Sequence, residues 1–144
     1  MPGRWELFDH TADVGLLAHG GDEAEALAAA GAGLFDLMID RDAVRESESV
    51  RVEVTGVDGP DLLVGWLNEL LYIFEVKGLA IRRVEVALTE DGRRLVAAAH
   101  GEPYDSARHG VRLGVKAATR HLAALDPDLA GPPGSWRARV ILDV

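Results

Sequence analysis

The chain has 144 residues, of which 48% are hydrophobic and 27% are charged, with no cysteine and a net charge of −9 at pH 7. This length and composition predict one soluble globular domain over residues 1–144, because a disordered chain would hold fewer apolar residues. The absence of cysteine excludes disulfides, thiol nucleophiles and thiolate metal sites, and fits a cytoplasmic protein. No apolar run approaches the ~20 residues of a membrane span, and the first residues lack the apolar core of a signal peptide.

The charge balance bears on the partners of the protein. A protein that binds a nucleic-acid backbone directly usually presents a basic patch, whereas the basic residues here are scattered in pairs such as Arg82-Arg83 and Arg93-Arg94. We therefore expect any RNA to be reached only through a partner protein. An acidic surface also suits docking on a basic protein.

The first third of the chain predicts two strands and a helix. Residues 5–8 and 14–18 are short apolar runs that favour strands. Asp22 has the position of a helix N-cap, with Glu25 three residues later as in a capping box. In the predicted helix, Gly31 and Gly33 allow close packing against a sheet. Its apolar residues recur at helical spacing, namely Leu27, Ala30, Leu34, Leu37 and Met38.

The middle of the chain predicts a strand followed by the strongest helix. Residues 49–57 alternate between apolar and polar side chains, which indicates a strand with one buried face. Residues 61–76 carry a broad apolar face and are expected to form the central core helix, ended by Gly78 as its C-cap. At ~100° per residue, Asn68 should face the solvent and Glu69 should lie at the edge of the apolar sector.

The last third predicts a hairpin, two loops and two further strands. Residues 81–89 and 94–101 form the hairpin over a turn at 90–92, residues 101–105 form a polar loop, and residues 115–125 form a strand. A proline-rich loop at 126–135 leads to a closing strand at 136–142. The elements together predict an α+β domain with a mixed, mostly antiparallel β-sheet and two main helices packed on it.

The first chemically notable stretch, Asp9-His10-Thr11-Ala12-Asp13, lies between the two predicted N-terminal strands. The carboxylates of Asp9 and Asp13 are hard oxygen donors suited to Ca²⁺ or Mg²⁺, while His10 suits a softer ion. The alternative is an Asx turn beside an ordinary surface carboxylate.

A second group of charged residues comes from the C-terminal half. Val140, Ile141 and Leu142 should anchor the last strand, which would hold Asp143 and the carboxylate of Val144 in place although termini usually fray. With Asp13 nearby, these oxygens would form a site for a hard cation; otherwise Asp143 is a surface residue beside a charged terminus.

Lys116 is one of two lysines among 15 basic residues, and it is a candidate phosphate binder or proton donor, or present by chance. The motifs of serine hydrolases, phosphate-binding loops and dinucleotide-binding folds are all absent. We therefore predict no catalytic residues.

Five blocks, in order and over nearly the whole length, resemble the archease family. They are Asp9-His10-Thr11-Ala12-Asp13-Val14-Gly15, Trp66-Leu67-Asn68-Glu69-Leu70-Leu71-Tyr72, Gly101-Glu102-Pro103-Tyr104-Asp105 through His109, Val115-Lys116-Ala117, and Val140-Ile141-Leu142-Asp143-Val144. Two positions depart from the family pattern: Arg120 replaces an aromatic residue and Gly110 replaces an acidic one.

The resemblance implies a non-catalytic protein cofactor of the GTP-dependent RtcB-type RNA ligase of tRNA splicing and RNA repair. Such a cofactor promotes guanylylation and multiple turnover of the ligase. It also implies a Ca²⁺-type site, which by motif falls on Asp13, Asp143 and Val144. The same matching places Asp9 and His10 close by and gives Glu69 and Lys116 activating or supporting roles.

Two other functions remain open on the sequence alone. The first is a metal-dependent phosphoester hydrolase that would use Asp9, His10, Asp13 and Asp143 as ligands. The second is a general chaperone or adaptor that associates with itself and acts through its acidic surface.

Overall fold

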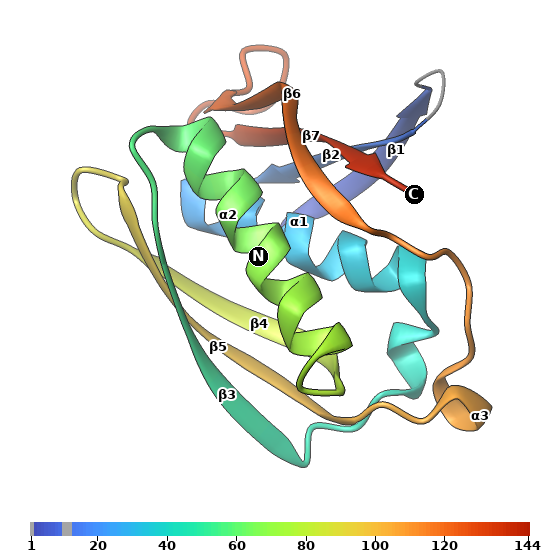
Figure 1. The fold of residues 1–144 in the computed structure, drawn as a ribbon. Helices are drawn as coiled ribbons and strands as arrows, with labels where there is room; N and C mark the ends of the chain where they lie inside the picture. The colour runs from blue at the N-terminus through green and yellow to red at the C-terminus, as the bar shows by residue number, and fades with distance from the viewer. Residues whose placement is uncertain (1, 10–12) are drawn as a thin grey trace.

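A computed structural model describes residues 2–9 and 13–144, and within these ranges the strands form two antiparallel sheets (Figure 1). The first sheet has the order β1-β2-β7-β6 and consists of β1 (Arg4–Asp9), β2 (Val14–Gly20), β7 (Trp136–Asp143) and β6 (Ala117–Pro127). The second has the order β3-β5-β4 and consists of β3 (Glu48–Thr55), β5 (Arg94–Pro103) and β4 (Leu79–Leu88).

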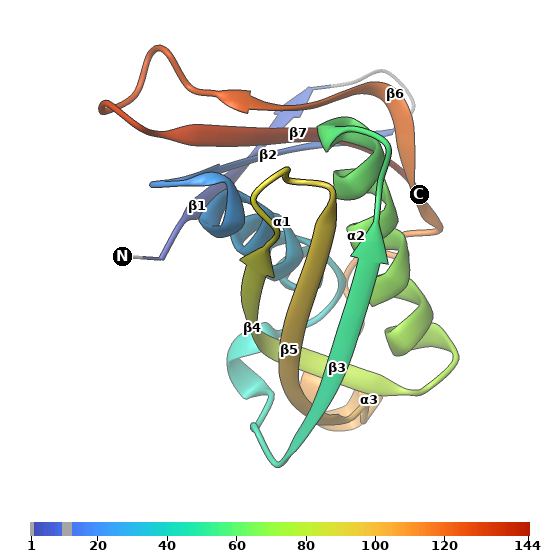
Figure 2. The ribbon, with the colours of Figure 1, turned by 90° about the vertical axis from the view of Figure 1, so that its left-hand side faces the viewer.

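Two long helices, α1 (Glu23–Met38) and α2 (Gly59–Glu75), each pack against both sheets. Helix α1 contacts β2 and β4, whereas α2 contacts β6 and β3. Figure 2 shows the first sheet above the helices and the second sheet in front of them. The predicted α+β class with two main helices is confirmed. The strands divide into two sheets because both helices bury more than one face, and a single sheet covers only one.

The predicted N-cap at Asp22 is confirmed by a hydrogen bond, whereas α2 begins two residues earlier than predicted, after an unpredicted N-cap at Asp58. The Asp22 carboxylate accepts from the Glu25 N–H at 2.8 Å, and the Asp58 carboxylate accepts from the Asp61 N–H at 2.9 Å. Helix α2 has its C-cap at Val76 rather than at Gly78, which follows two residues later with φ of 68°. Gly78 therefore turns the chain after the helix has ended.

Close packing around the α1 glycines is also confirmed. A Cβ on Gly33 would lie 2.7 Å from Cγ of Trp5, and a Cβ on Gly31 would lie 3.0 Å from Cδ1 of Leu70. Gly33 thus allows the predicted close packing against a sheet, whereas Gly31 packs against α2 and not against a sheet. The indole N–H of the buried Trp66 donates to the Leu27 carbonyl at 2.8 Å, so the largest core side chain leaves no polar atom unpaired.

The C-terminal half differs from expectation in three places. The expected polar loop at 101–105 is partly strand, because β5 continues to Pro103 and buries Glu102. A short helix, α3 (Ser106–His109), follows it, and a 3₁₀ turn, η1 (Arg41–Ala43), faces α3. Strand β6 begins and ends two residues later than predicted and is interrupted between Thr119 and Ala124. Within the described ranges, no helix has the length and apolar character to cross a membrane.

Candidate functional site

The register of the first sheet brings the N-terminal and C-terminal acidic residues to one end of it. Val14 pairs with Leu142, and Asp143 pairs with Ala117. Asp13 and Asp143, 130 positions apart in the sequence, therefore lie at the same end of neighbouring strands. We call Asp13, Asp143, Val144 and Lys116 the acidic tip.

Lys116 enters the tip through its main chain, because its N–H donates to the Asp143 carbonyl at 2.8 Å. The side chains of Lys116 and Asp143 are exposed, whereas Asp13 and Val144 are half-buried. The end of β7 lies beside the start of β2, because Leu142 pairs with Val14. The tip thus combines the exposed ammonium group of Lys116 with the exposed carboxylate of Asp143 and the half-buried carboxylate of Asp13.

Two predicted members of this site are only partly described. The backbone of Asp9 pairs with that of Val14, which places Asp9 at the same sheet end. The side chain of Asp9 and the whole of His10 lie outside the described residues. Among the residues that are described, no group of three or more histidines and carboxylates is placed to hold a metal ion. The chemistry of Asp13 and Asp143 fits a hard cation, but Ca²⁺ takes 6–8 oxygen ligands, so the metal site stays a prediction.

Asn68 has a different place from the one predicted. It does not face the solvent: its Oδ1 accepts from the Ala118 N–H at 2.8 Å, and its Nδ2 donates to the Ala118 carbonyl at 3.2 Å. The prediction was wrong because β6 covers the flank of α2 opposite the apolar centre, which helical periodicity does not reveal. Since Ala118 follows Ala117, the partner of Asp143, Asn68 joins the core helix to the strand beside the tip.

Glu69 follows Asn68 on α2 and is half-buried, as predicted for the edge of the apolar sector. Among the described residues it makes no ion pair with a member of the tip. Its predicted supporting role therefore rests on its position alone.

A buried cluster of polar residues around Glu102, which the sequence did not predict, lies where β5 meets α3. The Glu102 carboxylate accepts from the Arg45 N–H at 2.6 Å and from His109 Nε2 at 3.1 Å, and it pairs with Arg108. His109 Nδ1 accepts from the Asp105 N–H at 3.0 Å, so the proton of the neutral ring lies on Nε2. The hydrogen bond from Arg45, followed by that from Arg108, lowers the pKa of Glu102 to about 2. This cluster fastens the β5–α3 connection.

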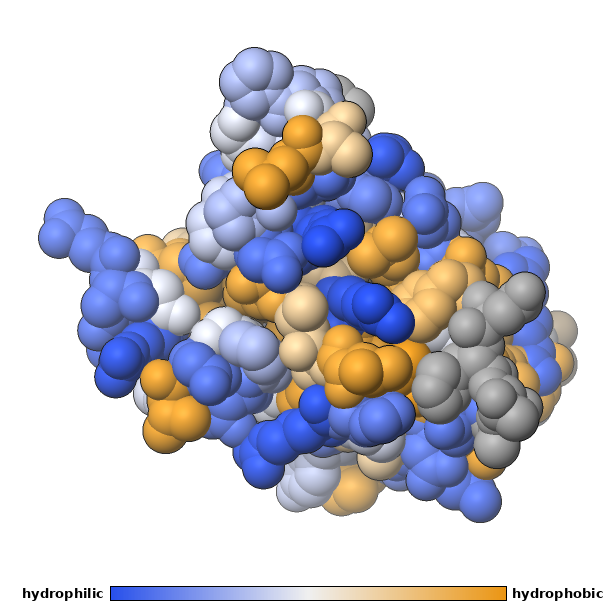
Figure 3. All heavy atoms as spheres, turned by 90° about the horizontal axis from the view of Figure 1, so that it is seen from above, coloured by the Kyte–Doolittle hydropathy of each residue, from blue (hydrophilic) through white to orange (hydrophobic). Residues whose placement is uncertain are grey.

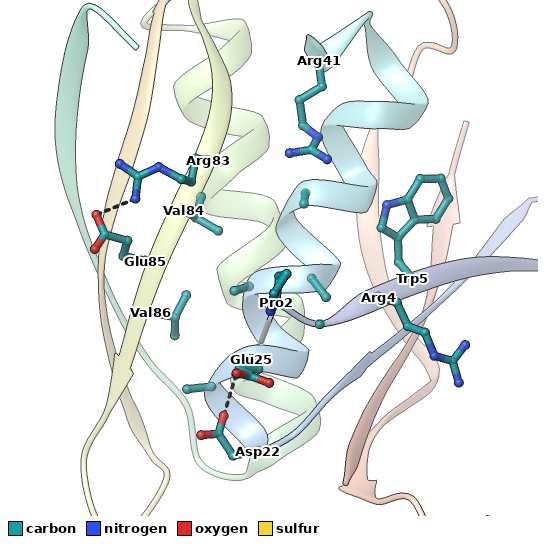
Figure 4. Close-up of a pocket in the computed structure, with 15 residues that line it drawn as sticks. Pro2, Arg4, Trp5, Asp22, Glu25, Arg41, Arg83, Val84, Glu85 and Val86 are labelled. Atoms are coloured by element: carbon teal, nitrogen blue, oxygen red, sulfur yellow. Dashed lines mark hydrogen bonds and ion pairs between the residues drawn. The ribbon is translucent and has the colours of Figure 1, made fainter. Parts of the chain in front are cut away.

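A groove of about 740 Å³ lies away from the tip between β4, α1 and β1 (Figure 4). Its charged residues already have partners: Arg41 pairs with Asp36, Arg83 with Glu46 and Glu85, and Asp22 caps α1. The groove therefore offers space without a reactive group.

The described residues form an α+β domain with the exposed Asp143 and the half-buried Asp13 at one end of its first sheet. Comparison with known proteins specifies the class. Residues 5–144 match the Archease protein family (MTH1598/TM1083), and the chain belongs to this family.

Individual relatives agree along the whole length. The Protein archease of Pyrococcus abyssi is 38% identical over 143 residues, covering 98% of this chain and 99% of the relative. That of Methanothermobacter thermautotrophicus is also 38% identical over 143 residues, with coverage of 97% and 98%. The solution structure of Methanobacterium thermoautotrophicum protein 1598 superposes with a TM-score of 0.75 at 36% identity, covering 97% of this chain and 98% of that chain. The family resemblance read from the sequence is thereby confirmed.

Proposed function

We propose that this protein activates a GTP-dependent RtcB-type RNA ligase and does not itself catalyse RNA joining. The observation that carries the proposal is the pairing of β2 with β7, which sets Asp13 beside Asp143 in a chain of the archease family. The two residues belong to separate sequence blocks, and the fold gives them a common location. Two carboxylates at an exposed sheet end suit contact with a metal- and nucleotide-dependent partner.

The acidic tip acts by entering the nucleotide pocket of the ligase. Asp13, Asp143 and the main-chain oxygen of Val144 would hold a divalent cation of the Ca²⁺ type, with Asp9 and His10 next to them. A bound cation supplies positive charge that attracts phosphate oxygens. The exposed ammonium group of Lys116 lies at the same sheet end and would contact a phosphate as a point charge. In this way the tip favours guanylylation of the ligase and its return to the cycle after each ligation.

RNA takes part only through the ligase. The net charge of −9 opposes direct binding of a phosphate backbone by this chain. The same charge favours docking near a basic nucleotide pocket. We place the complex in the cytoplasm, in tRNA splicing and RNA repair.

The test is a ligation time course with a limiting amount of the organism's RtcB-type ligase. Its substrate is excess RNA with a 2′,3′-cyclic phosphate, supplied with GTP and Mn²⁺. Without this protein, ligation should stall near one product per ligase, and with it ligation should continue through many turnovers. Asp13→Ala and Asp143→Ala should each abolish the stimulation while the circular dichroism spectrum stays unchanged. A wild-type protein that leaves the time course unchanged would refute the proposed function.

A further inference from the structure

The first sheet has a face turned away from the helices, which we call the outer face. Side chains alternate along β7, so that Ala138, Val140 and Leu142 belong to the hydrophobic core. Arg139, Ile141 and Asp143 consequently point to the outer face. Ile141 is only 1% exposed, yet it lies outside the core cluster. Its burial therefore comes from a second, smaller layer of side chains on the outer face.

Phe8 forms part of this layer. It pairs with Gly15, which in turn pairs with Ile141. A Cβ on Gly15 would come within 2.4 Å of the Phe8 ring, so the ring lies directly over the glycine. The guanidinium carbon of Arg139 lies 4.9 Å from the centre of the same ring. Phe8 is thus enclosed between Gly15 beneath and Arg139 above, an arrangement that holds the arginine in a fixed orientation.

Arg139 lacks a polar partner in the described part of the chain. Its Nε is buried and without a hydrogen bond, and no described carboxylate forms an ion pair with it. Arg137, two residues earlier on the same face, donates through Nε to Asp126 at 3.0 Å. A polar group that is shielded from water and unpaired destabilises the folded protein. Arg139 as a whole is half-buried, so its side chain is not closed off from a second molecule.

Strand β6 carries an exposed apolar side chain in its interrupted stretch, next to the residue that pairs with Arg139. Thr119 pairs with Ile141, and Ala124 pairs with Arg139. The four residues 120–123 of β6 therefore lie opposite the single residue 140 of β7. One of the four, Leu122, has φ of 58° and is 49% exposed. A leucine in the left-handed region is strained, and strained positions gather at functional sites. Figure 3 looks onto this side of the molecule and shows hydrophobic residues gathered around hydrophilic ones.

We propose that the outer face around Phe8, Leu122 and Arg139 is the surface on which the ligase docks. The ligase supplies a carboxylate to Arg139 within an apolar surround. This inference rests on the proposed function and names the contact that positions the tip. A carboxylate matches the planar fork of arginine, and the net charge of −9 disfavours an RNA phosphate. Arg139 and Asp143 are four residues apart on one face, or about 13 Å along the strand. The carboxylate of the ligase should therefore lie about that far from its nucleotide pocket.

The experiment measures the dissociation constant of the full-length protein for the ligase, in the absence of RNA, together with stimulated turnover over a range of protein concentrations. The variants are Arg139→Glu and the milder Arg139→Gln, which serves if the charge reversal unfolds the chain. Arg51→Glu is the matched control, because Arg51 is an exposed arginine on β3 of the second sheet. We expect Arg139→Glu to weaken binding at least about tenfold and Arg51→Glu to leave it unchanged. Saturating amounts of Arg139→Glu should restore full turnover, because its tip is intact.

Each other result assigns a different role. Unchanged affinity of both Arg139 variants overturns the docking surface while the proposed function stands. A lower turnover plateau at unchanged affinity overturns it too, because the arginine would then act in activation. Weaker binding seen only when RNA is present would assign Arg139 to a phosphate and overturn the protein contact. If the wild-type protein neither binds nor stimulates the ligase, the proposed function fails and the docking surface fails with it.

Discussion

Asn68 of α2 holds the main chain of Ala118 on β6 through both ends of its amide, at 2.8 Å and 3.2 Å. The first sheet is thereby fixed to the core helix at the strand that flanks Asp143. The position of the acidic tip consequently depends on a residue that bears no charge. Because the amide satisfies a backbone N–H and a C=O together, a substitution at Asn68 leaves two main-chain groups without partners.

Asn68→Ala should destabilise the protein by about 1–3 kcal/mol, the usual effect of leaving buried hydrogen-bonding groups unsatisfied. It should also lower stimulation of the ligase, because β6 would no longer be held beside β7. Urea unfolding checks the first effect and the ligation time course the second. The matched control is Glu75→Ala, which removes an exposed side chain from the end of the same helix. Equal unfolding free energies for the two variants would show that the Asn68 contacts carry little energy.

Gly33→Ala should destabilise the protein by about 1–3 kcal/mol, because the added methyl group overpacks the α1–β1 contact. The new Cβ would lie 2.7 Å from Trp5 and 3.0 Å from Cδ1 of Leu16. Gly114→Ala is the control, since a Cβ there meets nothing within 4 Å. Thermal unfolding should separate the two variants by several degrees. A Gly33→Ala protein as stable as the control would mean that Trp5 moves aside freely.

The stability of the protein should fall in acid through Glu102. Hydrogen bonds from Arg45 and then Arg108 lower the pKa of this carboxyl to about 2 in the folded state, from 4.5. A lowered folded-state pKa stabilises the fold above pH 4.5, and the stabilisation is lost as the pH falls towards 2. Glu102→Gln should therefore be less stable at neutral pH and show a flatter decline over this window. Urea unfolding at several pH values measures both slopes. Glu48→Gln, at an exposed strand start, should retain the wild-type slope, and a wild-type slope for Glu102→Gln would contradict the prediction.

Calcium should raise the melting temperature of the wild-type protein if the acidic tip holds the ion. A ligand at 100 times its dissociation constant stabilises a protein by about 2.7 kcal/mol. Asp13→Asn and Asp143→Asn should each remove most of this shift, since each takes away a charged oxygen ligand. Asp42→Asn makes the same charge change at an exposed residue of η1 and should keep the full shift. Loss of the shift in all three variants would point to general screening of the negative charge.

Local patterns were sufficient for most of the secondary structure. The N-cap Asp22, the helical spacing of apolar residues and the alternation in β3 and β7 each depend on neighbours within a few residues, so the sequence alone predicts them. The sequence predicts a loop at Glu102, because burying an unpaired charge is costly. In the structure, Arg45, Arg108 and His109 compensate that cost. Arg45 lies 57 positions away in the sequence, so no local pattern reveals this contact.

Sequence patterns were enough to predict the two helices, most of the strands, the family and the candidate residues Asp13 and Asp143. The pairing of β2 with β7 through the first sheet, and the contact of Asn68 with β6, became visible only in the folded protein. The folded protein also places Arg139 over the Phe8 ring, on the face of the sheet that carries Asp143, with no hydrogen-bond partner for its Nε among the described residues. The reason is physical: capping and periodicity depend on neighbours along the chain, whereas strand pairing depends on contacts between residues far apart in sequence, which no local pattern records.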